Sequence, residues 1–579
     1  MYKAMLLASA ATCALLLTPH ISAAATVANP ICTDNTALFD PGNGEDIVIP
    51  SGYQISVFSS GLNFPTGIAF RGDSSHFEIY VLESGHGLPS VCNEQGSFGS
   101  GEFDAANPFT PDVLVFDESG KKLRGPLAKP TASGGLQSAG PAVDIGFENG
   151  LKGGRLFATD SNQATHAAGQ NNSSRIVVID PDTGDVTPFI SNLPTGDHPS
   201  EQLAFKGGWI YWSQGTTTNS GVVGGDNGGG KNQQDIPCRD ITLSDNVFDS
   251  GNGIMTSGYS PYGTQRPGAV VQAFESASHH GVCDGAILRA RLNSPQPDTT
   301  IEPYSWGYRN GYAIRFSPVN HALAGELLVG EDGADERGAR PSNNAPDNIQ
   351  VARKADDGGP DYHGWPDQYG FLPSSQAVYN PVGGPGDDLC VSDPTNLPST
   401  CSAASLAKIL SEDVPLRDVL AAPPQDITSP IATEAADSSF TGIEFVPDSF
   451  VRGPVKSGAV LYSLEGDFGF SASNATDPAH EVGHEVKLIN FSNPGKPLSL
   501  EISEFAHNNT FDQAFVSGIH GWNRPTNVRM GPDGCAWVVD YGAVRDFGQG
   551  GADSKYVGAA NGPLVQIPGT GVIYRICPQ

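Results

Sequence analysis

His198 is the histidine whose surroundings best suit a general base. It lies in NLPTGDHPSEQLAF, with Asp197 directly before it, at the start of an apolar segment. Histidine is the natural proton acceptor near neutral pH, and a polar loop with an adjacent aspartate can hold the imidazole. The alternative is an ordinary surface histidine, and this alternative also applies to His363.

Two pairs of arginine and asparagine stand directly before apolar segments. Arg309 and Asn310 precede GYAIRF, and Asn523 and Arg524 precede PTNVRM. Arginine offers a planar fork to carboxylates, and asparagine offers a donor and an acceptor. Two arginines that converge on one axis would form an anion pocket, which would suit a quinone cofactor bearing carboxylates. The alternative is that Arg309 pairs with one of the many acidic residues.

An acidic stretch between residues 327 and 367 is rich in oxygen atoms that could bind a cation. Its acidic residues include Glu331, Asp332, Asp335, Glu336, Asp347 and Asp361. Together with nearby glycine carbonyls, these oxygens suit a hard cation such as calcium. Their spacing is not that of an EF-hand, and a solvated acidic loop is the alternative.

These residues belong to a pattern that recurs six times along the chain. Each copy is a short apolar strand followed by a turn and a second apolar strand. The first strands of the copies are PTGIAF (65–70), PAVDIGF (141–147), EQLAF (201–205), NGYAIRF (310–316), FTGIEFV (440–446) and PTNVRM (525–530). Six such pairs predict an all-β fold, a six-bladed β-propeller with long loop insertions. His198, Arg309 and Arg524 then lie where strands begin, facing one end of the axis.

The insertions are longest at residues 213–300 and 335–435, which are rich in Gly, Asn, Asp, Ser and Pro. In a propeller such loops lie on one face, where binding sites usually occur. The alternative is that these loops have no role in binding. No polar linker divides the copies. We therefore expect residues 26–579 to form a single domain.

The first 25 residues have the pattern of a secretory signal peptide. Lys3 is followed by an apolar run over residues 4–18 and by small residues at 22–25, and such segments are removed on secretion. We therefore expect a secreted, extracellular protein. Sequons at Asn171, Asn172, Asn474, Asn490 and Asn508 then predict surface glycans.

Eight cysteines follow the predicted signal peptide. An even number in an oxidising compartment predicts up to four disulfides. The pairings easiest to anticipate are Cys390 with Cys401, which closes a short loop, and Cys535 with Cys577, which joins the last repeat to the C-terminus.

The net charge is −31, from 32 basic and 63 acidic side chains. Nucleic acids and anionic membranes require basic patches, so this balance argues against both as partners. No stretch after the predicted signal peptide has enough uninterrupted apolar residues to cross a bilayer. We expect a monomer whose partners are small molecules.

Over about residues 50–577 the chain resembles the soluble quinoprotein glucose/sorbosone dehydrogenases. The similarity is sharpest in LNFPTGIAF with YVLESGHG, in LPTGDHPSEQLAFKGGWIYWSQG, in GYRNGYAIRFSP, and in GEDGADE with PDNIQV and DYHGWP. NRPTNVRMGPDG and GVIYRI complete the pattern.

The resemblance implies an oxidoreductase that oxidises a sugar with pyrroloquinoline quinone and calcium. It implies His198 as the catalytic base, quinone contacts from Arg309, Asn310 and Arg524, and calcium on the backbone carbonyls of Gly333 and Ala334. The sequence contains no cytochrome-like CxxCH motif, so electrons would pass to a separate acceptor.

The chain departs from the family in three places. Ser213 stands near the position of an aspartate that orients the histidine, Thr526 replaces a second arginine, and residues 462–471 offer no counterpart to a lysine. Two other functions therefore stay open. One is a calcium-dependent lactonase or esterase on the same frame, and the other is a non-catalytic propeller that binds glycans or proteins.

Overall fold

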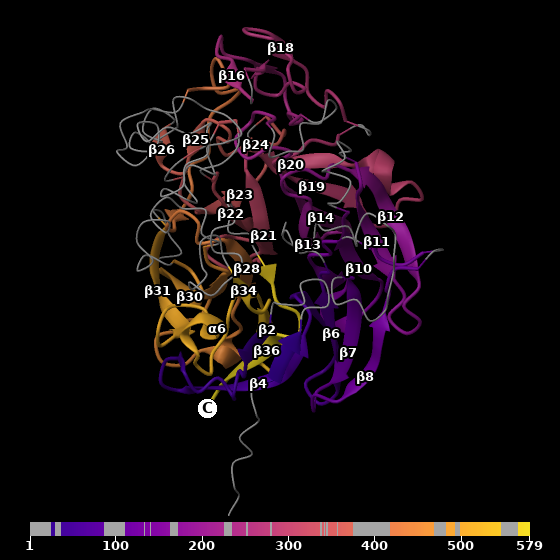
Figure 1. The fold of residues 1–579 in the computed structure, drawn as a ribbon, viewed down its shortest axis with the longest axis vertical. Helices are drawn as coiled ribbons and strands as arrows, with labels where there is room; N and C mark the ends of the chain where they lie inside the picture. The colour runs from indigo at the N-terminus through magenta and orange to yellow at the C-terminus, as the bar shows by residue number, and fades with distance from the viewer. Residues whose placement is uncertain are drawn as a thin grey trace, which may run out of the picture.

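Six β-sheets surround a common axis in the computed structural model of the chain (Figure 1). The structure describes residues 25–28, 36–85, 110–131, 134–138, 140–162, 172–224, 234–250, 253–277, 281–335, 339–340, 342, 345–355, 357–373, 417–467, 482–492, 498–545 and 565–579. The predicted all-β, six-bladed propeller is confirmed.

The first three sheets follow one another along the chain. The first contains β5 (Pro65–Gly72), β6 (Phe77–Glu83), β7 (Asp112–Asp117) and β8 (Lys122–Leu127). The second contains β9 (Ile145–Phe147), β10 (Leu156–Asp160), β11 (Ser174–Ile179) and β12 (Val186–Leu193). The third contains β13 (Ser200–Lys206), β14 (Trp209–Gln214), β19 (Ala286–Arg291) and β20 (Glu302–Trp306), and β24 (Asp361–Tyr362) extends it in parallel.

The remaining sheets complete the ring. The fourth contains β21 (Asn310–Phe316), β22 (Leu327–Asp332), β23 (Asn348–Ala352) and β27 (Ala432–Thr433). The fifth contains β28 (Phe440–Phe445), β29 (Val460–Leu464), β30 (Glu485–Ser492) and β31 (Ser499–Asn508), with β3 (Ile47–Val48) at its edge. The sixth contains β32 (Pro525–Met530), β33 (Ala536–Asp540), β36 (Gly571–Pro578) and β4 (Tyr53–Leu62). Each predicted repeat thus supplies the innermost strand of one sheet.

The ring is closed by strands from opposite ends of the chain. The inner strands β5, β9, β13, β21, β28 and β32 contact one another in that order, and β32 contacts β5. At the outside of the sixth sheet, β4 pairs antiparallel with the C-terminal β36. The Cys535–Cys577 disulfide, which confirms the prediction, joins the start of β33 to β36 in the same sheet. The N-terminal strand therefore holds the last sheet against the first.

Apolar side chains fill the space between neighbouring sheets. Trp537 of the sixth sheet, for example, is fully buried and contacts the rings of Phe58, Phe70 and Phe77 edge on. Such aromatic contacts bury large apolar areas and explain why alternate residues of each strand are apolar.

The axis itself is crossed by polar side chains. Gln202 of the third sheet donates to the Thr441 carbonyl of the fifth at 2.7 Å, and Arg529 of the sixth donates to Gln202 Oε1 at 3.1 Å. Asn527 donates to the Thr66 carbonyl of the first sheet at 2.9 Å. The third and sixth sheets lie opposite each other in a ring of six, so these bonds tie the sheets together across the axis.

Two long insertions pack together as a cap beyond the third and fourth sheets. The cap is the described part of residues 217–277, 357–373 and 417–427, and it carries three short strand pairs. These pairs are β15 (Ile241–Thr242) with β18 (Val270–Val271), β16 (Phe248–Asp249) with β17 (Met255–Thr256), and β25 (Gln368–Tyr369) with β26 (Leu372–Pro373). In Figure 1, β16 and β18 lie at the upper end of the molecule, beyond β20 and β24.

Two further strand pairs and one short α-helix lie outside the six sheets and the cap. β1 (Ala25–Ala28) pairs with β2 (Thr36–Phe39), β34 (Val544–Arg545) pairs with β35 (Val565–Gln566), and α6 (Ala514–Ser517) is the one α-helix of the described residues. None of the helices in this part of the chain is long and apolar enough to cross a membrane.

Several sequence predictions fall on residues outside the described ranges. They are the signal peptide up to residue 24, the Cys390–Cys401 pairing, and the sequons at Asn171 and Asn474. Cys238 and Cys283, for which the sequence indicated no partner, form a disulfide within the third sheet and the cap.

Two predicted glycosylation sites are incompatible with this fold. Asn490 and Asn508 are buried, and their Nδ2 atoms donate hydrogen bonds to backbone carbonyls of Pro454 and of Asp512 and Trp522. The atom that a glycan requires is therefore committed to the interior. Asn172, in contrast, is exposed.

We predict that replacing Cys535 and Cys577 together by serine lowers the free energy of unfolding. The bond closes a loop of 42 residues, which in the chain-entropy description stabilises the fold by about 4 kcal/mol. Denaturant unfolding of the variant and of the oxidised wild type measures the difference. An unchanged midpoint would show that the β4–β36 pairing alone keeps the ring closed.

Candidate active site

Buried acidic residues mark the end of the propeller at which the inner strands begin, here termed the site face. The second strand of each sheet is antiparallel to the inner strand, so it ends at this face. The residues at or directly after those ends are Glu83, Asp160, Gln214, Asp332, Glu465 and Asp540. Five of these six carry a carboxyl group, which makes the site face acidic.

Carboxylates at or next to these strand ends hold the chain where it enters the inner strand of the same sheet. Asp540 accepts the backbone N–H of Asn523 at 2.9 Å and of Arg524 at 2.7 Å. Glu331 accepts the N–H of Arg309 at 3.0 Å. Both predicted arginine and asparagine pairs are therefore fixed by acidic residues of their own sheets.

The inner strands are irregular at the same end. In β5, β13, β21, β28 and β32 the pairing register shifts within the first residues. Such bulges redirect side chains locally. In β13 the shift spans Glu201 and Gln202, so that Gln202 reaches across the axis.

Arg309 connects three separate segments at the site face. Its Nη2 contacts Asp335 Oδ2 at 2.6 Å and Asp197 Oδ2 at 3.2 Å, and its Nη1 donates to the Gly333 carbonyl at 2.8 Å. The residue is 4% exposed. The alternative raised by the sequence, pairing with acidic residues, is therefore correct for this structure, and it brings Arg309 next to the His198 loop.

His198 lies beside that ion pair and retains contact with solvent. Its Nε2 is 3.8 Å from Asp197 Oδ2, and 23% of its side chain is exposed. Its backbone N–H donates to the Thr216 carbonyl at 3.1 Å, and the N–H of Thr216 donates to the Arg309 carbonyl at 3.1 Å. His198, Asp197 and Arg309 are thus joined through both side chains and backbone.

Gly215 packs directly against His198. A Cβ atom at Gly215 would lie 2.2 Å from the His198 Cβ, which is closer than such atoms approach. The His198 side chain can therefore occupy its position only because residue 215 is a glycine.

Asn310 faces the acidic residues of the fourth sheet. Its Nδ2 donates to Asp332 Oδ2 at 3.0 Å. Asp347 accepts the N–H groups of Gly333 and Ser439, each at 2.7 Å. Burial raises the pKa of Asp332, and the nearby Asp347 carboxylate raises it further.

The acidic residues between positions 327 and 367 do not form one solvated loop. Glu331, Asp347 and Asp361 are buried, so the alternative of a solvated loop is wrong for them. Glu336 lies outside the described residues. The one group of three described metal-binding side chains that converges, Asp533 with Cys535 and Cys577, includes both cysteines of a disulfide. Calcium on the backbone carbonyls of Gly333 and Ala334 stays a prediction.

Arg524 contacts the loop that follows β29 in the fifth sheet. Its side chain is fully buried, and it donates to the carbonyls of Gly466 and Asp467, each at 2.8 Å. These carbonyls follow β29 in the fifth sheet, so the guanidinium serves to hold that loop. Contact between Arg524 and a cofactor stays a prediction.

His363 is a core residue rather than the surface histidine that its loop position allowed. Its ring stacks on Tyr308, its Nδ1 lies 3.0 Å from Gln350 Oε1, and its Nε2 lies 3.3 Å from Asp361 Oδ2. Burial lowers its pKa. Its ring thus packs against Tyr308, the residue directly before Arg309.

The cap supplies residues that sequence reasoning missed. Asn219 makes two hydrogen bonds with the backbone of Asp335, both of 2.8 Å. The Asn219 Nδ2 donates to the Asp335 carbonyl, and the Asp335 N–H donates to Asn219 Oδ1. These residues lie 116 positions apart. The run of three threonines before Asn219 was the available signal, since consecutive short hydroxyl residues often bond to neighbouring backbone and carboxylate groups.

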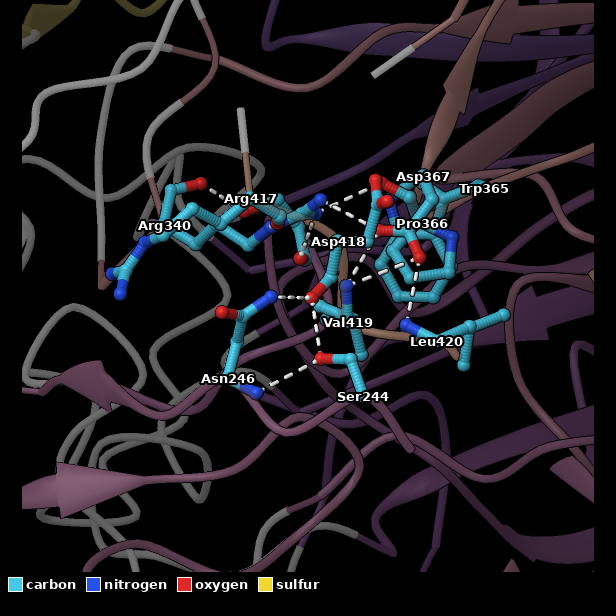
Figure 2. A network of polar contacts seen from close by, with 12 residues as sticks. Ser244, Asn246, Arg340, Trp365, Pro366, Asp367, Arg417, Asp418, Val419 and Leu420 are labelled. Atoms are coloured by element: carbon cyan, nitrogen blue, oxygen red, sulfur yellow. Dashed lines mark hydrogen bonds and ion pairs between the residues drawn. The ribbon is translucent and has the colours of Figure 1, made fainter. Parts of the chain in front are cut away.

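Arg340 holds Ser220, the residue directly after Asn219. It is fully buried, and it donates to the carbonyls of Ser220 at 2.9 Å, Pro366 at 2.8 Å and Arg417 at 2.8 Å, and to Asp367 Oδ1 at 2.6 Å. Figure 2 shows Arg340 beside Pro366, Asp367 and Arg417, and the N–H groups of Val419 and Leu420 donate to the Asp367 carboxylate. All three segments of the cap thereby contact Arg340.

Two further carboxylates accept hydrogen bonds from two of the three threonines. Thr217 donates through N–H and hydroxyl to Asp284, and Thr218 does the same to Asp235. Burial raises the pKa of both acids, and each lies close to a cysteine of the Cys238–Cys283 disulfide. The disulfide therefore helps to hold the loop after β14, in which the Thr216 carbonyl accepts the His198 N–H.

Solved structures similar to this chain include a Thermus thermophilus oxidoreductase described as a glucose dehydrogenase. It is 13% identical, with a TM-score of 0.44, over 91% of this chain and 100% of that one. An AA12 carbohydrate-active enzyme of Trichoderma reesei, in its calcium structure, is 12% identical, with a TM-score of 0.47, over 92% and 97%. A protein described as a gluconolactonase is 10% identical, with a TM-score of 0.21, over 54% and 81%.

No protein-family model and no curated protein matches the chain. At these low identities and TM-scores the similar structures decide neither the activity nor the site.

The buried acids of the site face predict an unusual dependence of stability on pH. Burial raises the pKa of Glu331 and of Glu465 to about 7 and that of Asp540 to about 6. Between the ordinary pKa and these values the folded chain binds more protons than the unfolded chain. Stability therefore falls as pH rises through this window.

We predict that the free energy of unfolding is lower at about pH 7.5 than at about pH 5, by at least about 1 kcal/mol. Denaturant unfolding at constant ionic strength measures it. Glu465→Gln should reduce the difference because one titrating group is lost. A stability that rises between these two pH values would contradict the burial argument.

Proposed function

We propose that the chain is a secreted oxidoreductase that oxidises a hydroxyl group of a sugar at the site face. In this proposal His198 is the general base and pyrroloquinoline quinone, with calcium, is the electron acceptor. The observation that carries the proposal is the single contact group formed by His198, Asp197, Arg309 and the Gly333 carbonyl. It joins the predicted base to the predicted cofactor-binding residues.

Two buried atoms support a ligand at this place. Arg309 Nε and Asn310 Oδ1 are buried and have no hydrogen-bond partner within the described residues. Buried polar atoms are nearly always satisfied, so one donor and one acceptor await a group that the structure does not contain. A quinone with carbonyl and N–H groups fits this pair.

The residues that would hold the cofactor follow from the same geometry. Arg309 and Asn310 would contact the quinone, and the Gly333 and Ala334 carbonyls would bind calcium. The Gly333 oxygen accepts one bond from Arg309 and, like any carbonyl, keeps a second lone pair. When bound, the quinone supplies a two-electron acceptor for the hydride of the carbon that carries the hydroxyl, with calcium as Lewis acid.

His198 would take the proton of the sugar hydroxyl. The Asp197 carboxylate, 3.8 Å from Nε2, favours the imidazolium that results, because a nearby negative charge stabilises a cation. Arg309 holds the Asp197 carboxylate at 3.2 Å and so limits its movement. Asp197 thereby takes the orienting role that the family gives to an aspartate near the Ser213 position.

The remaining parts of the proposal concern partners. The oxidised sugar would leave as a lactone when the hydroxyl is anomeric, and electrons would pass to a separate acceptor. A chain with net charge −31 favours an uncharged sugar over an acidic one, because like charges repel.

Equilibrium titration with the quinone, with and without calcium, tests the proposal, followed by dye reduction with a panel of aldoses. We expect binding at micromolar concentration and sugar-dependent reduction. Absence of binding would rule out the quinone enzyme. Hydrolysis of lactones without added quinone would favour the lactonase alternative instead.

We predict that His198→Ala lowers kcat by about 10²- to 10⁴-fold, the usual contribution of a general base. Quinone affinity should stay within about threefold, since His198 is not among its proposed contacts. His76→Ala is the control, because His76 is a surface residue paired with Glu118, and its activity should equal that of the wild type. Full activity of His198→Ala would remove this residue from its proposed role.

We also predict that Gly215→Ala lowers kcat by about 10²-fold, because the new methyl group displaces His198 and small misplacements are costly. Gly134→Ala is the matched control, since no atom lies within 4 Å of a Cβ at that position. Steady-state kinetics and circular dichroism are measured on both. Normal kinetics of a folded Gly215→Ala would show that the position of His198 is not critical.

A further inference from the structure

We propose that a basic patch at the end of the propeller opposite the site face binds an acidic polysaccharide, a chain of uronic acid residues. The basic patch consists of Lys206 in β13, Arg289 and Arg291 in β19, and Arg353 and Lys354 directly after β23. The patch lies away from the site face, so it would bind its ligand whether or not the proposed oxidation takes place there.

The course of the strands places the basic patch. Inner strands begin at the site face, so Lys206, the last residue of β13, lies at the opposite end. β14 runs antiparallel to β13, and β19 runs antiparallel to β14, so Arg291 at the end of β19 lies at that end as well. By the same alternation β23 ends there, directly before Arg353. A ligand at the patch therefore leaves the site face open.

The patch is continuous across two neighbouring sheets. In the third sheet Lys206 lies opposite Trp209, and Trp209 lies opposite Arg291. The Lys206 ammonium group lies 4.4 Å from the centroid of the Phe316 ring in the fourth sheet. One ligand can therefore contact basic residues of both sheets.

Two carboxylates lie among the five basic residues. Glu302 accepts a hydrogen bond from Arg289 Nε at 2.8 Å and lies 3.5 Å from Lys354 Nζ. Glu326 lies 2.8 Å from Arg353 Nη2. Two acids cannot neutralise five bases, so the patch keeps a positive charge in a chain whose net charge is −31.

Lys206 and Arg291 carry the positive charge that these acids leave unbalanced. Both residues are exposed, and neither forms an ion pair with any residue that the structure describes. Lys206 donates instead to the Gly325 carbonyl, and Arg291 Cζ lies 3.7 Å from the centroid of the Trp209 ring. Their charged groups are therefore available to an anion.

Trp209 gathers two of the positive charges. The Cζ atom of Arg289 lies 4.2 Å from the same ring centroid as that of Arg291. The electron-rich face of the indole attracts both guanidinium groups, which brings two like charges close together. A bound carboxylate relieves this repulsion, and each guanidinium offers paired N–H groups that match the two carboxylate oxygens.

The spread of the basic residues favours a polymer over a small anion. They extend from the third sheet to the fourth, so a ligand that meets them all must carry negative charges at intervals. A folded acidic protein fits less well, because protein interfaces usually have an apolar core and few lysines. Here the aromatic side chains Trp209, Tyr304 and Phe316 are partly buried in the core between the two sheets.

A chain of uronic acids also fits better than a nucleic acid. Phosphates follow one another closely along a nucleic acid, and the acidic remainder of the protein repels them. A polyuronate carries its carboxylates one to each sugar ring, so its charge is less dense. At physiological ionic strength the acidic residues farther away than about 8 Å are largely screened from it.

Calorimetric titration of the full chain with soluble polygalacturonate in calcium-free buffer tests the inference. We expect binding that weakens as the salt concentration rises. Lys206→Gln with Arg291→Gln should weaken it about tenfold, as expected for the loss of two surface ion pairs. The matched control is Lys121→Gln with Lys152→Gln, because these exposed lysines lie at the same end of the first and second sheets. Its affinity should equal that of the wild type.

No binding of polygalacturonate, or equal affinities of the patch variant and the control variant, would overturn the inference. Tighter binding of polyglutamate or of single-stranded DNA, at the same concentration of negative charge, would overturn the choice of a polysaccharide. If the patch variant fails to fold, Arg291→Gln alone is measured, and it should lower the affinity about threefold. An unchanged affinity of that variant would count against the patch in the same way.

Discussion

The contact between Arg309 and its two aspartates is the interaction on which the candidate site depends. It joins the loop before β13, in the third sheet, to the start of β21 and the loop after β22, which lie at the same end of the fourth sheet. A buried charge that loses its partner typically costs about 3–5 kcal/mol. Loss of Arg309 would remove the positive charge that lies beside both Asp197 and Asp335, and His198 would lose the residue that contacts its neighbour Asp197.

The rest of the fold serves to bring these segments together. The ring closed by β4 and β36 fixes the relative position of the sheets, and the polar bonds across the axis prevent them from sliding. The cap then adds a second layer of restraint. Arg340 contacts three segments of the cap, two of which, at Pro366–Asp367 and at Arg417, are labelled in Figure 2. Ser220, in the third segment, follows Asn219, which bonds to the backbone of Asp335.

The acidic character of the site face has a structural origin as well as a chemical one. Glu331 and Asp540 accept backbone N–H groups at the start of inner strands, which neutral side chains of the same size do less strongly. The same burial raises the pKa values of these acids. The same buried acids therefore hold the segments that carry Arg309, Asn310 and Arg524 and lower the stability of the fold at neutral pH relative to acidic pH.

Local patterns predicted the frame, whereas the contacts of the site depend on distant residues. The six apolar strands are readable because alternation and turns are local features, and each became an inner strand. Asn219 with Asp335, or Arg309 with Asp197, lie more than a hundred positions apart, and no spacing in the sequence indicates them. The same limit explains Arg524, whose partners at residues 465–467 lie in another sheet, and the buried sequons at Asn490 and Asn508.

The most direct test of the central claim is a crystal structure of the chain grown with calcium and pyrroloquinoline quinone. The account predicts electron density for the quinone at the site face, in contact with Arg309 and Asn310 and beside His198. Density for the quinone on the opposite face of the propeller, or within the cap away from His198, would contradict it.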